Sequence, residues 1–157
     1  MPQLPRDDVP IGRCHILCVG IGQYTELVNR NLRYAVKDAE AVAKVFEDFR
    51  RGSFEVELLT KPTQTTKFKL DKAIDQMLNG DDRHAEDLAV IYFSCHGDLS
   101  TPDGAFCLHP SDATLRADGT FNKTTVLNIY DLAKMLSGAR VHNIIVFLDV
   151  CHSGGAG

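Results

Sequence analysis

One stretch organises the chain: Asn143-Ile144-Ile145-Val146-Phe147-Leu148-Asp149-Val150-Cys151-His152-Ser153-Gly154-Gly155. Its apolar run, 144–148, is rich in β-branched and aromatic side chains and predicts a strand buried on both faces, as in a parallel sheet. The run is followed by a polar, glycine-rich turn that contains Cys151. Open α/β sheets carry their sites at the carboxyl ends of parallel strands, so the Cys151 thiol is a candidate reactive group.

A second stretch has the same design. The apolar run 88–93 predicts another buried strand, which ends at the polar sequence Ser94-Cys95-His96-Gly97-Asp98. Two strands of one parallel sheet would place His96 and Cys151 at the same edge. Because neighbouring strands lie roughly 4.8 Å apart, the two side chains would meet across a small cleft. A thiol beside an imidazole is the minimal pair for nucleophilic catalysis by cysteine.

The composition fits a single globular domain. The chain has 157 residues, 44% of them hydrophobic, and a formal net charge of −4, so neither nucleic acid nor an anionic membrane is an expected partner. No apolar run approaches the roughly 20 residues of a membrane span. The polar residues 1–12 predict an N-terminal arm and not a signal peptide. The odd count of five cysteines does not fit a disulfide framework, which favours a reducing, cytoplasmic location.

The periodicity of apolar residues predicts alternating strands and helices. Strands are expected at 15–20, 54–59, 88–93 and 144–148, helices within 31–50, 65–78 and 129–136, and short strands near 105–108 and 124–127. Asn31 and either Thr65 or Thr66 are the expected helix caps. Such alternation predicts an α/β fold, a mostly parallel sheet with helices on both faces. The strand order 2-1-3-4 would put the strands of His96 and Cys151 side by side, with the polar segment after His96 as a loop over this edge.

The positions of Cys151 and His96 suggest a role for each. Cys151 would attack a scissile carbonyl as a thiolate, and His96 would stabilise the thiolate and then protonate the leaving amine. The backbone N–H groups of Cys151 and Gly97 are the expected donors to the tetrahedral oxyanion. The remaining cysteines are interpreted as packing side chains and the remaining histidines receive no role: Cys14, Cys18, Cys95 and Cys107; His15, His84, His109, His142 and His152.

Two other interpretations of these motifs are weaker. Cys95-His96 and Cys151-His152 contain enough ligands for a tetrahedral zinc site. However, adjacent residues of a strand point to opposite faces, and structural zinc pairs are usually two to four residues apart. Gly20-Ile21-Gly22 lacks the third glycine of the dinucleotide fingerprint. Neither a metal nor a nucleotide is therefore expected.

The motifs resemble those of the caspase-like cysteine peptidases of clan CD, family C14, and are closer to the metacaspases and their bacterial relatives than to the animal caspases. The matching segments are 92–97 (Tyr-Phe-Ser-Cys-His-Gly), 147–154 (Phe-Leu-Asp-Val-Cys-His-Ser-Gly) and 32–39 (Leu-Arg-Tyr-Ala-Val-Lys-Asp-Ala). The spacing from His96 to Cys151 also fits the caspase type. The resemblance implies a caspase-like three-layer α-β-α sandwich, with residues 13–157 as the catalytic large subunit, called p20.

The resemblance also implies a specificity and a partner. It makes His96 and Cys151 the catalytic dyad, and Asp38 and Asp149 the acidic walls of an S1 pocket that takes Arg or Lys. A guanidinium binds a carboxylate through two hydrogen bonds, so Arg is expected to be preferred over Lys. Family members pair p20 with a small subunit, p10, which this chain does not contain, so p10 and a peptide substrate are the expected partners.

No organic cofactor is expected, and a calcium requirement is only weakly indicated. Asp103, Asp112 and Asp118 are available in the loop after His96, but Leu127-Asn128 stands where paired aspartates are expected. The sequence thus predicts a caspase-like cysteine endopeptidase. The alternatives are a non-catalytic caspase-like scaffold or regulator, and a redox-sensing or zinc protein that uses Cys151.

Overall fold

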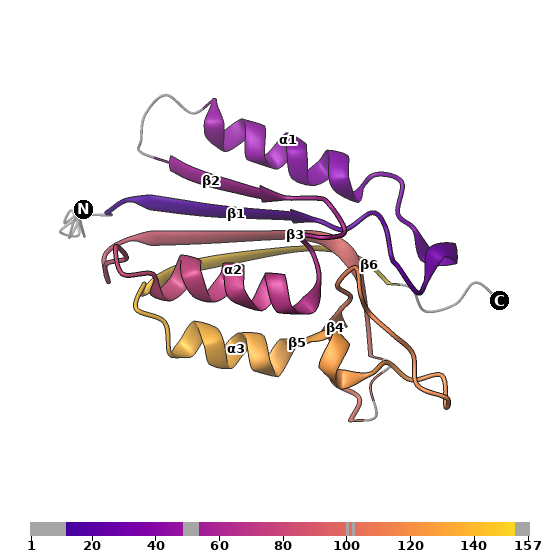
Figure 1. Cartoon of the computed structure of the whole chain (residues 1–157). Coiled ribbons are helices and arrows are strands. Elements are labelled where there is room, and N and C mark those ends of the chain that lie inside the picture. Colours follow the sequence, from indigo (N-terminus) through magenta and orange to yellow (C-terminus); the bar gives the residue numbers. More distant parts are fainter. Residues whose placement is uncertain (1–11, 49–53, 100, 102, 153–157) are drawn as a thin grey trace, which may run out of the picture.

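A mixed sheet with helices on both faces forms the centre of the structure, which is a computed structural model that describes residues 12–48, 54–99, 101 and 103–152 (Figure 1). The strands are β1 (Cys14–Gly20), β2 (Phe54–Leu59), β3 (Leu88–Asp98), β4 (Cys107–Leu108), β5 (Leu127–Asn128) and β6 (Asn143–His152). The helices are α1 (Ala35–Glu47), α2 (Lys67–Asn79) and α3 (Ile129–Ser137), with 3-10 turns at Val28–Arg30 and Lys123–Thr125. The predicted fold class is confirmed.

The long strands of the sheet are parallel and follow the predicted order. β1 pairs with β2 on one side and with β3 on the other, and β6 pairs with the far side of β3. The order β2-β1-β3-β6 places the strands of His96 and Cys151 next to each other. β4 and β5 form a small antiparallel extension at the carboxyl end of β3, so the predicted short strands exist and are shorter than expected.

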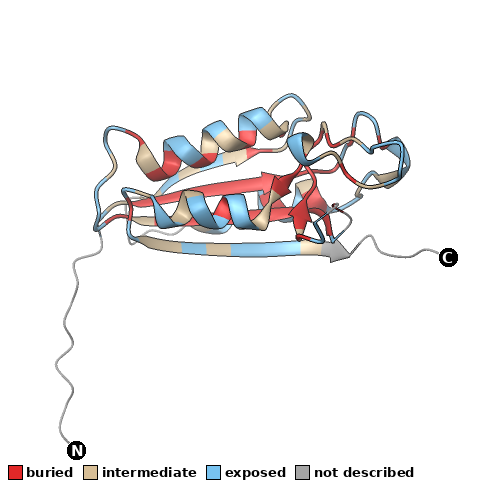
Figure 2. Ribbon diagram, turned by 90° about the horizontal axis from the view of Figure 1, so that it is seen from below, coloured by how far each residue is buried: buried red, intermediate tan, exposed pale blue. Residues whose placement is uncertain are grey.

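Each face of the sheet packs against its own helix layer. On one face, alternate residues of β1 and β3 pack against α2 and α3, with Leu17, Ile91 and Phe93 meeting Ile74 and Leu78. On the other face, the intervening strand residues pack against the small side chains of α1. Figure 2 shows that β1 and β3 are the buried centre, whereas β6 lies along one side and is largely exposed. No helix in the described part of the chain is long and apolar enough to cross a membrane.

The helix starts agree only in part with the sequence patterns. Thr66 accepts a hydrogen bond from the N–H of Lys69 and caps α2 as predicted. The predicted cap at Asn31 is wrong: α1 begins at Ala35, and the Asn31 side chain instead accepts the N–H of Tyr24 at 2.9 Å. α1 ends at Glu47, and the stop expected at 50–52 lies outside the described residues.

The strands of the candidate site differ from the predictions in length and burial. β3 and β6 continue past their apolar runs to Asp98 and His152, so His96 and Cys151 lie within strands and not in turns after them. β3 continues because β4 supplies new partners at its end. The burial predicted for both faces of 144–148 is wrong, since Ile145 and Phe147 are 43% and 51% exposed.

Candidate functional site

The candidate site lies at the carboxyl edge of the sheet, where β3 and β6 run side by side (Figure 1). The parallel register pairs His96 with Cys151 and Ser94 with Asp149. Neighbouring strands lie about 4.8 Å apart, so the backbone brings together the two residues that the sequence indicated. The side chain of Cys151 lies outside the described residues.

Both polar groups of the His96 main chain are hydrogen-bonded. Its N–H donates to the Tyr24 hydroxyl at 3.0 Å, and its carbonyl accepts the N–H of His109 at 2.9 Å. β1 has already ended at Gly20, opposite Ser94, so these two bonds replace the missing ladder partner. The backbone that carries the imidazole is therefore fixed beyond the end of the neighbouring strand.

The imidazole of His96 is hydrogen-bonded at one nitrogen, and the other nitrogen has no partner among the described residues. Nε2 lies 2.7 Å from the carbonyl oxygen of Arg30. A carbonyl only accepts, so Nε2 carries the hydrogen and the neutral ring keeps its lone pair on Nδ1. Nδ1 is buried and has no hydrogen-bond partner in the described part of the chain. Buried polar atoms are usually paired, so this nitrogen, on the residue opposite Cys151, is a candidate proton acceptor.

Asp149 is tied to the same strands through Tyr92. The Tyr92 hydroxyl donates to Asp149 Oδ2 at 2.9 Å. Burial, and to a smaller extent this bond to a carboxylate, raises the pKa of Tyr92 to about 12. The nearby charge of Asp38 adds to the shift. Asp38 lies on the exposed side of the first turn of α1. The two predicted S1 carboxylates therefore both act on one hydroxyl on the α1 side of the sheet.

Gly97 lies in a tight part of β3. A Cβ added there would lie 2.7 Å from Phe106 Cζ and 3.1 Å from the Cys107 carbonyl oxygen, so Phe106 would have to move. Successive peptide groups of a strand point to opposite sides. Because the N–H of His96 points to the side of Tyr24, the N–H of Gly97 points to the side of β6. The register with β6 continues to this residue, which pairs with His152.

A second buried histidine, which the sequence did not single out, lies behind His96. His109 is 0% exposed, and its ring centroid is 6.4 Å from that of His96 and 3.9 Å from that of Phe121. Its Nε2 is 3.5 Å from Asp98 Oδ1. Burial lowers the pKa of His109 to about 4 despite the opposing charge of Asp98. His109 is therefore a neutral packing neighbour of the site at pH 7.

The described residues offer little support for a metal at this edge. Cys95 packs in the core on the α2 side, whereas the preceding and following residues of β3 face α1, so Cys95 and His96 cannot bind one ion. No cluster of three or more His, Cys, Asp or Glu occurs among the described side chains. Asp103 and Asp112 bond to the Lys123 ammonium and to the N–H of Lys67.

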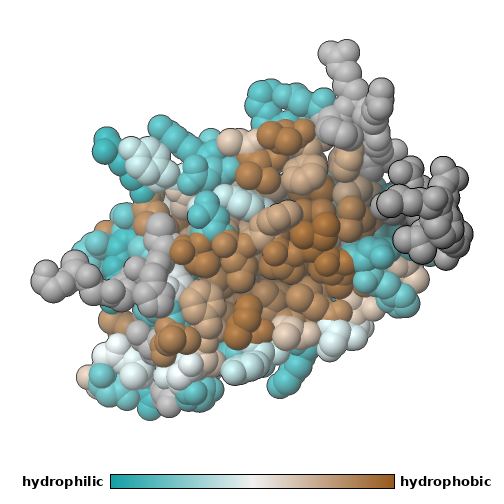
Figure 3. Space-filling view, turned by 180° about the vertical axis from the view of Figure 1, so that it is seen from behind, coloured by the Kyte–Doolittle hydropathy of each residue, from teal (hydrophilic) through white to brown (hydrophobic). Residues whose placement is uncertain are grey.

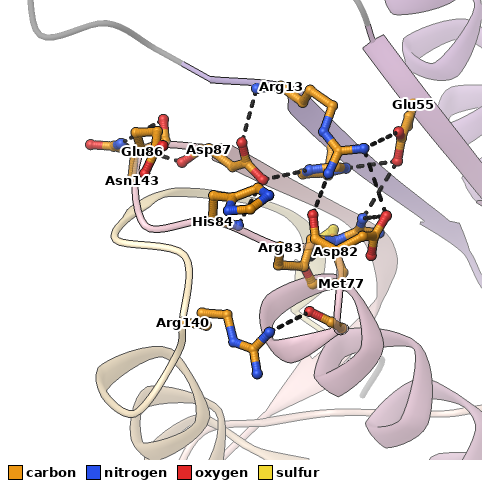
Figure 4. Close-up of polar contacts among 12 residues, drawn as sticks. Arg13, Glu55, Met77, Asp82, Arg83, His84, Glu86, Asp87, Arg140 and Asn143 are labelled. Atoms are coloured by element: carbon orange, nitrogen blue, oxygen red, sulfur yellow. Dashed lines mark hydrogen bonds and ion pairs between the residues drawn. The ribbon is translucent and has the colours of Figure 1, made fainter.

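A larger polar network occupies the opposite, amino edge of the sheet (Figure 4). His15, which is 1% exposed, contacts Glu55 Oε2 through Nδ1 at 2.9 Å and Asp87 Oδ2 through Nε2 at 3.1 Å. Arg13 and Arg83 surround Glu55 at 3.5 and 3.6 Å. No sequence pattern indicated this network, because its members come from separate elements.

The β6 part of the α1 face of the sheet is apolar and exposed in the described part of the chain. Ile144, Val146 and Val150 of β6 pack toward α2 and α3, so the alternate residues Ile145 and Phe147 point to the other face. Seen from that side, the molecule shows a broad hydrophobic area at its centre (Figure 3). β6 pairs with β3 alone among the described strands, so this area continues to the edge of the sheet.

Comparisons with known proteins agree with this architecture. The crystal structure of protein GSU0716 from Geobacter sulfurreducens is similar, with a TM-score of 0.69, 21% sequence identity, and coverage of 92% of this chain and 52% of that one. This chain thus spans about half of that protein's length, and the likeness concerns the fold. No curated protein matches the chain. The family model of the caspase domain, peptidase C14, matches residues 13–157. The chain therefore belongs to the caspase-domain family.

Proposed function

We propose that this chain is the p20 part of a caspase-like cysteine endopeptidase, with Cys151 as nucleophile and His96 as acid and base. The observation that carries the proposal is the register of β3 and β6, which sets Cys151 opposite His96. The Nε2 of this histidine is bonded to the Arg30 carbonyl, and its Nδ1 has no partner in the described part of the chain. This arrangement supplies a proton acceptor beside a thiol, as cysteine nucleophiles require.

The chemistry follows from these positions. The Cys151 thiol gives its proton to Nδ1 of His96, and the thiolate forms a bond to the scissile carbonyl carbon. The N–H groups of Cys151 and Gly97 stabilise the resulting oxyanion. The imidazolium returns the proton to the leaving amine as the C–N bond breaks, which leaves a thioester. His96 then takes a proton from water, the hydroxide displaces the thiolate, and the acid product leaves.

The proposed specificity is for basic P1 residues, with Arg preferred over Lys. Two exposed carboxylates, Asp38 and Asp149, lie near the Tyr92 hydroxyl on the α1 side of the sheet. An arriving guanidinium would relieve their mutual repulsion and bind a carboxylate through two hydrogen bonds. A P1 aspartate would add a third negative charge at the same place.

The proposed partner is a p10 segment or subunit that covers β6. The exposed Ile145 and Phe147, together with the unpaired outer side of β6 in the described sheet, form a surface that proteins normally cover. The similar solved structure is about twice as long as this chain. No organic cofactor is needed for the proposed reaction.

A covalent probe tests the function directly. The native protein, with any partner that copurifies, is treated with a peptidyl acyloxymethyl ketone carrying Arg at P1, and the labelled residue is found by mass spectrometry. The other cysteines are an internal control, because Cys14, Cys18, Cys95 and Cys107 are buried, and burial, with a smaller contribution from Glu47, raises the pKa of Cys18 to about 11.

The expected result is labelling of Cys151 alone, lost in Cys151→Ala and much slower with Asp at P1. Absence of labelling in a protein that binds its partner would favour a non-catalytic scaffold instead. Faster labelling by the Asp probe, or unchanged Arg selectivity in both Asp38→Ala and Asp149→Ala, would contradict the proposed S1 pocket.

A further inference from the structure

Two hydrogen bonds close the loop between β1 and α1, which lies beside His96. The N–H of Leu32 donates to the Gly22 carbonyl at 2.9 Å. The N–H of Tyr24 donates to Asn31 Oδ1 at 2.9 Å. These two bonds join the start and the end of the segment 22–32. The groups that it presents to His96 are therefore held by a closed loop, and Asn31, which does not cap α1, is part of the closure.

Two groups of this loop contact His96 at different places. The Tyr24 hydroxyl accepts the backbone N–H of His96 at 3.0 Å, and the two rings lie 5.4 Å apart between centroids. The Arg30 carbonyl accepts from His96 Nε2 at 2.7 Å. Tyr24 is 2% exposed, so its ring is anchored in the core. The loop thus holds both the backbone and the ring of the histidine.

The Tyr24 hydroxyl accepts a hydrogen bond from β3 that a neighbouring strand would otherwise accept. β1 stops pairing at Gly20, opposite Ser94. The N–H of His96, two residues further along β3, would be buried and unbonded without the hydroxyl, and such groups are rare because they are costly. The hydroxyl thus allows β3 to stay extended beyond the end of β1.

We propose that Tyr24 is a positioning residue: its hydroxyl and ring, with the loop closed by Asn31, hold His96 so that the hydrogen stays on Nε2 and the lone pair on Nδ1. The meaning of this tautomer for catalysis rests on the proposed function. The tautomer itself is a property of the folded chain and is measurable without any substrate.

The inference predicts a change in the ring and in the rate. In Tyr24→Phe the His96 N–H loses its acceptor, the end of β3 relaxes, and the Nε2 bond to the Arg30 carbonyl lengthens. The neutral imidazole then exchanges between tautomers. Because catalysis depends on sub-ångström placement, kcat should fall roughly 10-fold while KM changes little, since Tyr24 acts on the histidine and not on the proposed S1 carboxylates.

The primary experiment is ¹⁵N NMR of the histidine rings in the native protein and in Tyr24→Phe. Tyr130→Phe is the matched control, because Tyr130 is 66% exposed on α3, in the other helix layer. Asn31→Ala is a second variant that opens the loop and leaves the hydroxyl in place. Circular dichroism at the measuring temperature verifies that each variant is folded.

The expected result is a pure Nε2–H pattern for His96 in the native protein and in Tyr130→Phe, with averaged ring shifts in Tyr24→Phe and smaller changes of the same kind in Asn31→Ala. An unchanged Nε2–H pattern in folded Tyr24→Phe, with unchanged kcat and pH profile, would overturn the inference and leave the proposed function intact. Averaged shifts in Tyr24→Phe, together with no labelling of Cys151 in the native protein, would support the positioning role and reject the peptidase.

Discussion

Two buried histidines lie at opposite edges of the same sheet and have opposite hydrogen-bond states. At the amino edge, both ring nitrogens of His15 contact carboxylate oxygens, those of Glu55 and Asp87. At the carboxyl edge, His96 has one nitrogen bonded to a carbonyl and the other without a partner in the described residues. Both ring nitrogens of His15 are therefore occupied, whereas His96, which lies opposite Cys151 in the register, retains a lone pair on Nδ1.

The difference shows how burial alone fails to identify a functional histidine. Both side chains are at most 9% exposed, and both lie on strands of the sheet. What distinguishes them is the number of bonded ring nitrogens and the residue opposite. Complete pairing indicates a role in stability, and incomplete pairing beside a nucleophile indicates a role in a reaction.

The largest effect that tests this comparison is on catalysis. Cys151→Ala should abolish peptide cleavage, and His96→Ala should lower kcat by roughly 10²–10⁴-fold, the usual contribution of a general acid and base. His15→Ala should leave kcat per folded molecule unchanged, because its ring is at the other edge. The measurement is turnover of an Arg-containing fluorogenic peptide by the native assembly. Turnover by purified Cys151→Ala would remove the catalytic assignment.

The next effect is on stability, and it should be large at the amino edge, at His15, where no effect on kcat is expected. His15→Ala leaves the buried Asp87 carboxylate without its imidazole, and breaking a buried pair costs roughly 3 kcal/mol of unfolding free energy. His142→Ala is the matched control, since His142 is exposed near the same edge and should change stability by less than about 0.5 kcal/mol. Urea denaturation at pH 7 measures both variants.

The stability difference between the native protein and His15→Ala should depend on pH. Burial alone would raise the pKa of Asp87, but bonds from the N–H of His84, the His15 ring and the N–H of Arg13 hold it below its ordinary value. The carboxylate therefore stabilises the fold above its unfolded pKa, near 4, and this contribution is lost as the pH falls through the lower folded pKa. The cost of His15→Ala should shrink below about pH 4. A cost that stays constant down to pH 3 would contradict this pairing.

A third buried histidine, His109, should have a smaller effect on stability than His15, and its effect should depend on pH. Burial lowers its pKa to about 4, below the roughly 6.5 of the unfolded chain. The unfolded state therefore binds the proton first on acidification. This group should remove about 2 kcal/mol of stability between pH 7 and pH 5. His109→Gln should flatten that part of the stability curve. An NMR titration that shows His109 charged at pH 5.5 in the folded protein would be the contrary result.

The sheet and the position of the site were predictable because both depend on local patterns. Apolar runs such as 88–93 identified the long strands, and the alternation with helices gave their order. Once that order is known, His96 and Cys151 fall at one edge with no further information. The strand ends were less predictable, since β3 continues only because β4, from a later segment, pairs with it.

The contacts that tune the site were not predictable, because they join distant parts of the chain. His15 reaches partners 40 and 72 residues away, and His96 reaches Tyr24 and Arg30 at separations of 72 and 66. No spacing rule connects such pairs. The apolar run 144–148 indicated that a surface needs burial, but it carried no information on whether this chain or a partner covers Ile145 and Phe147.

The smallest predicted effect concerns Tyr92, whose hydroxyl bonds to Asp149. Tyr92→Phe removes one hydrogen bond to an exposed carboxylate, which water can solvate, so stability should fall by less than about 1 kcal/mol. If Asp149 binds the P1 guanidinium, losing the group that orients it should raise KM for an Arg substrate a few-fold with little change in kcat. The same substitution should leave cleavage unchanged in an Asp149→Ala background, because the orienting bond no longer exists. Equal effects of Tyr92→Phe in both backgrounds would show that Tyr92 acts on the site by another route, and that Asp149 is not the carboxylate through which it acts.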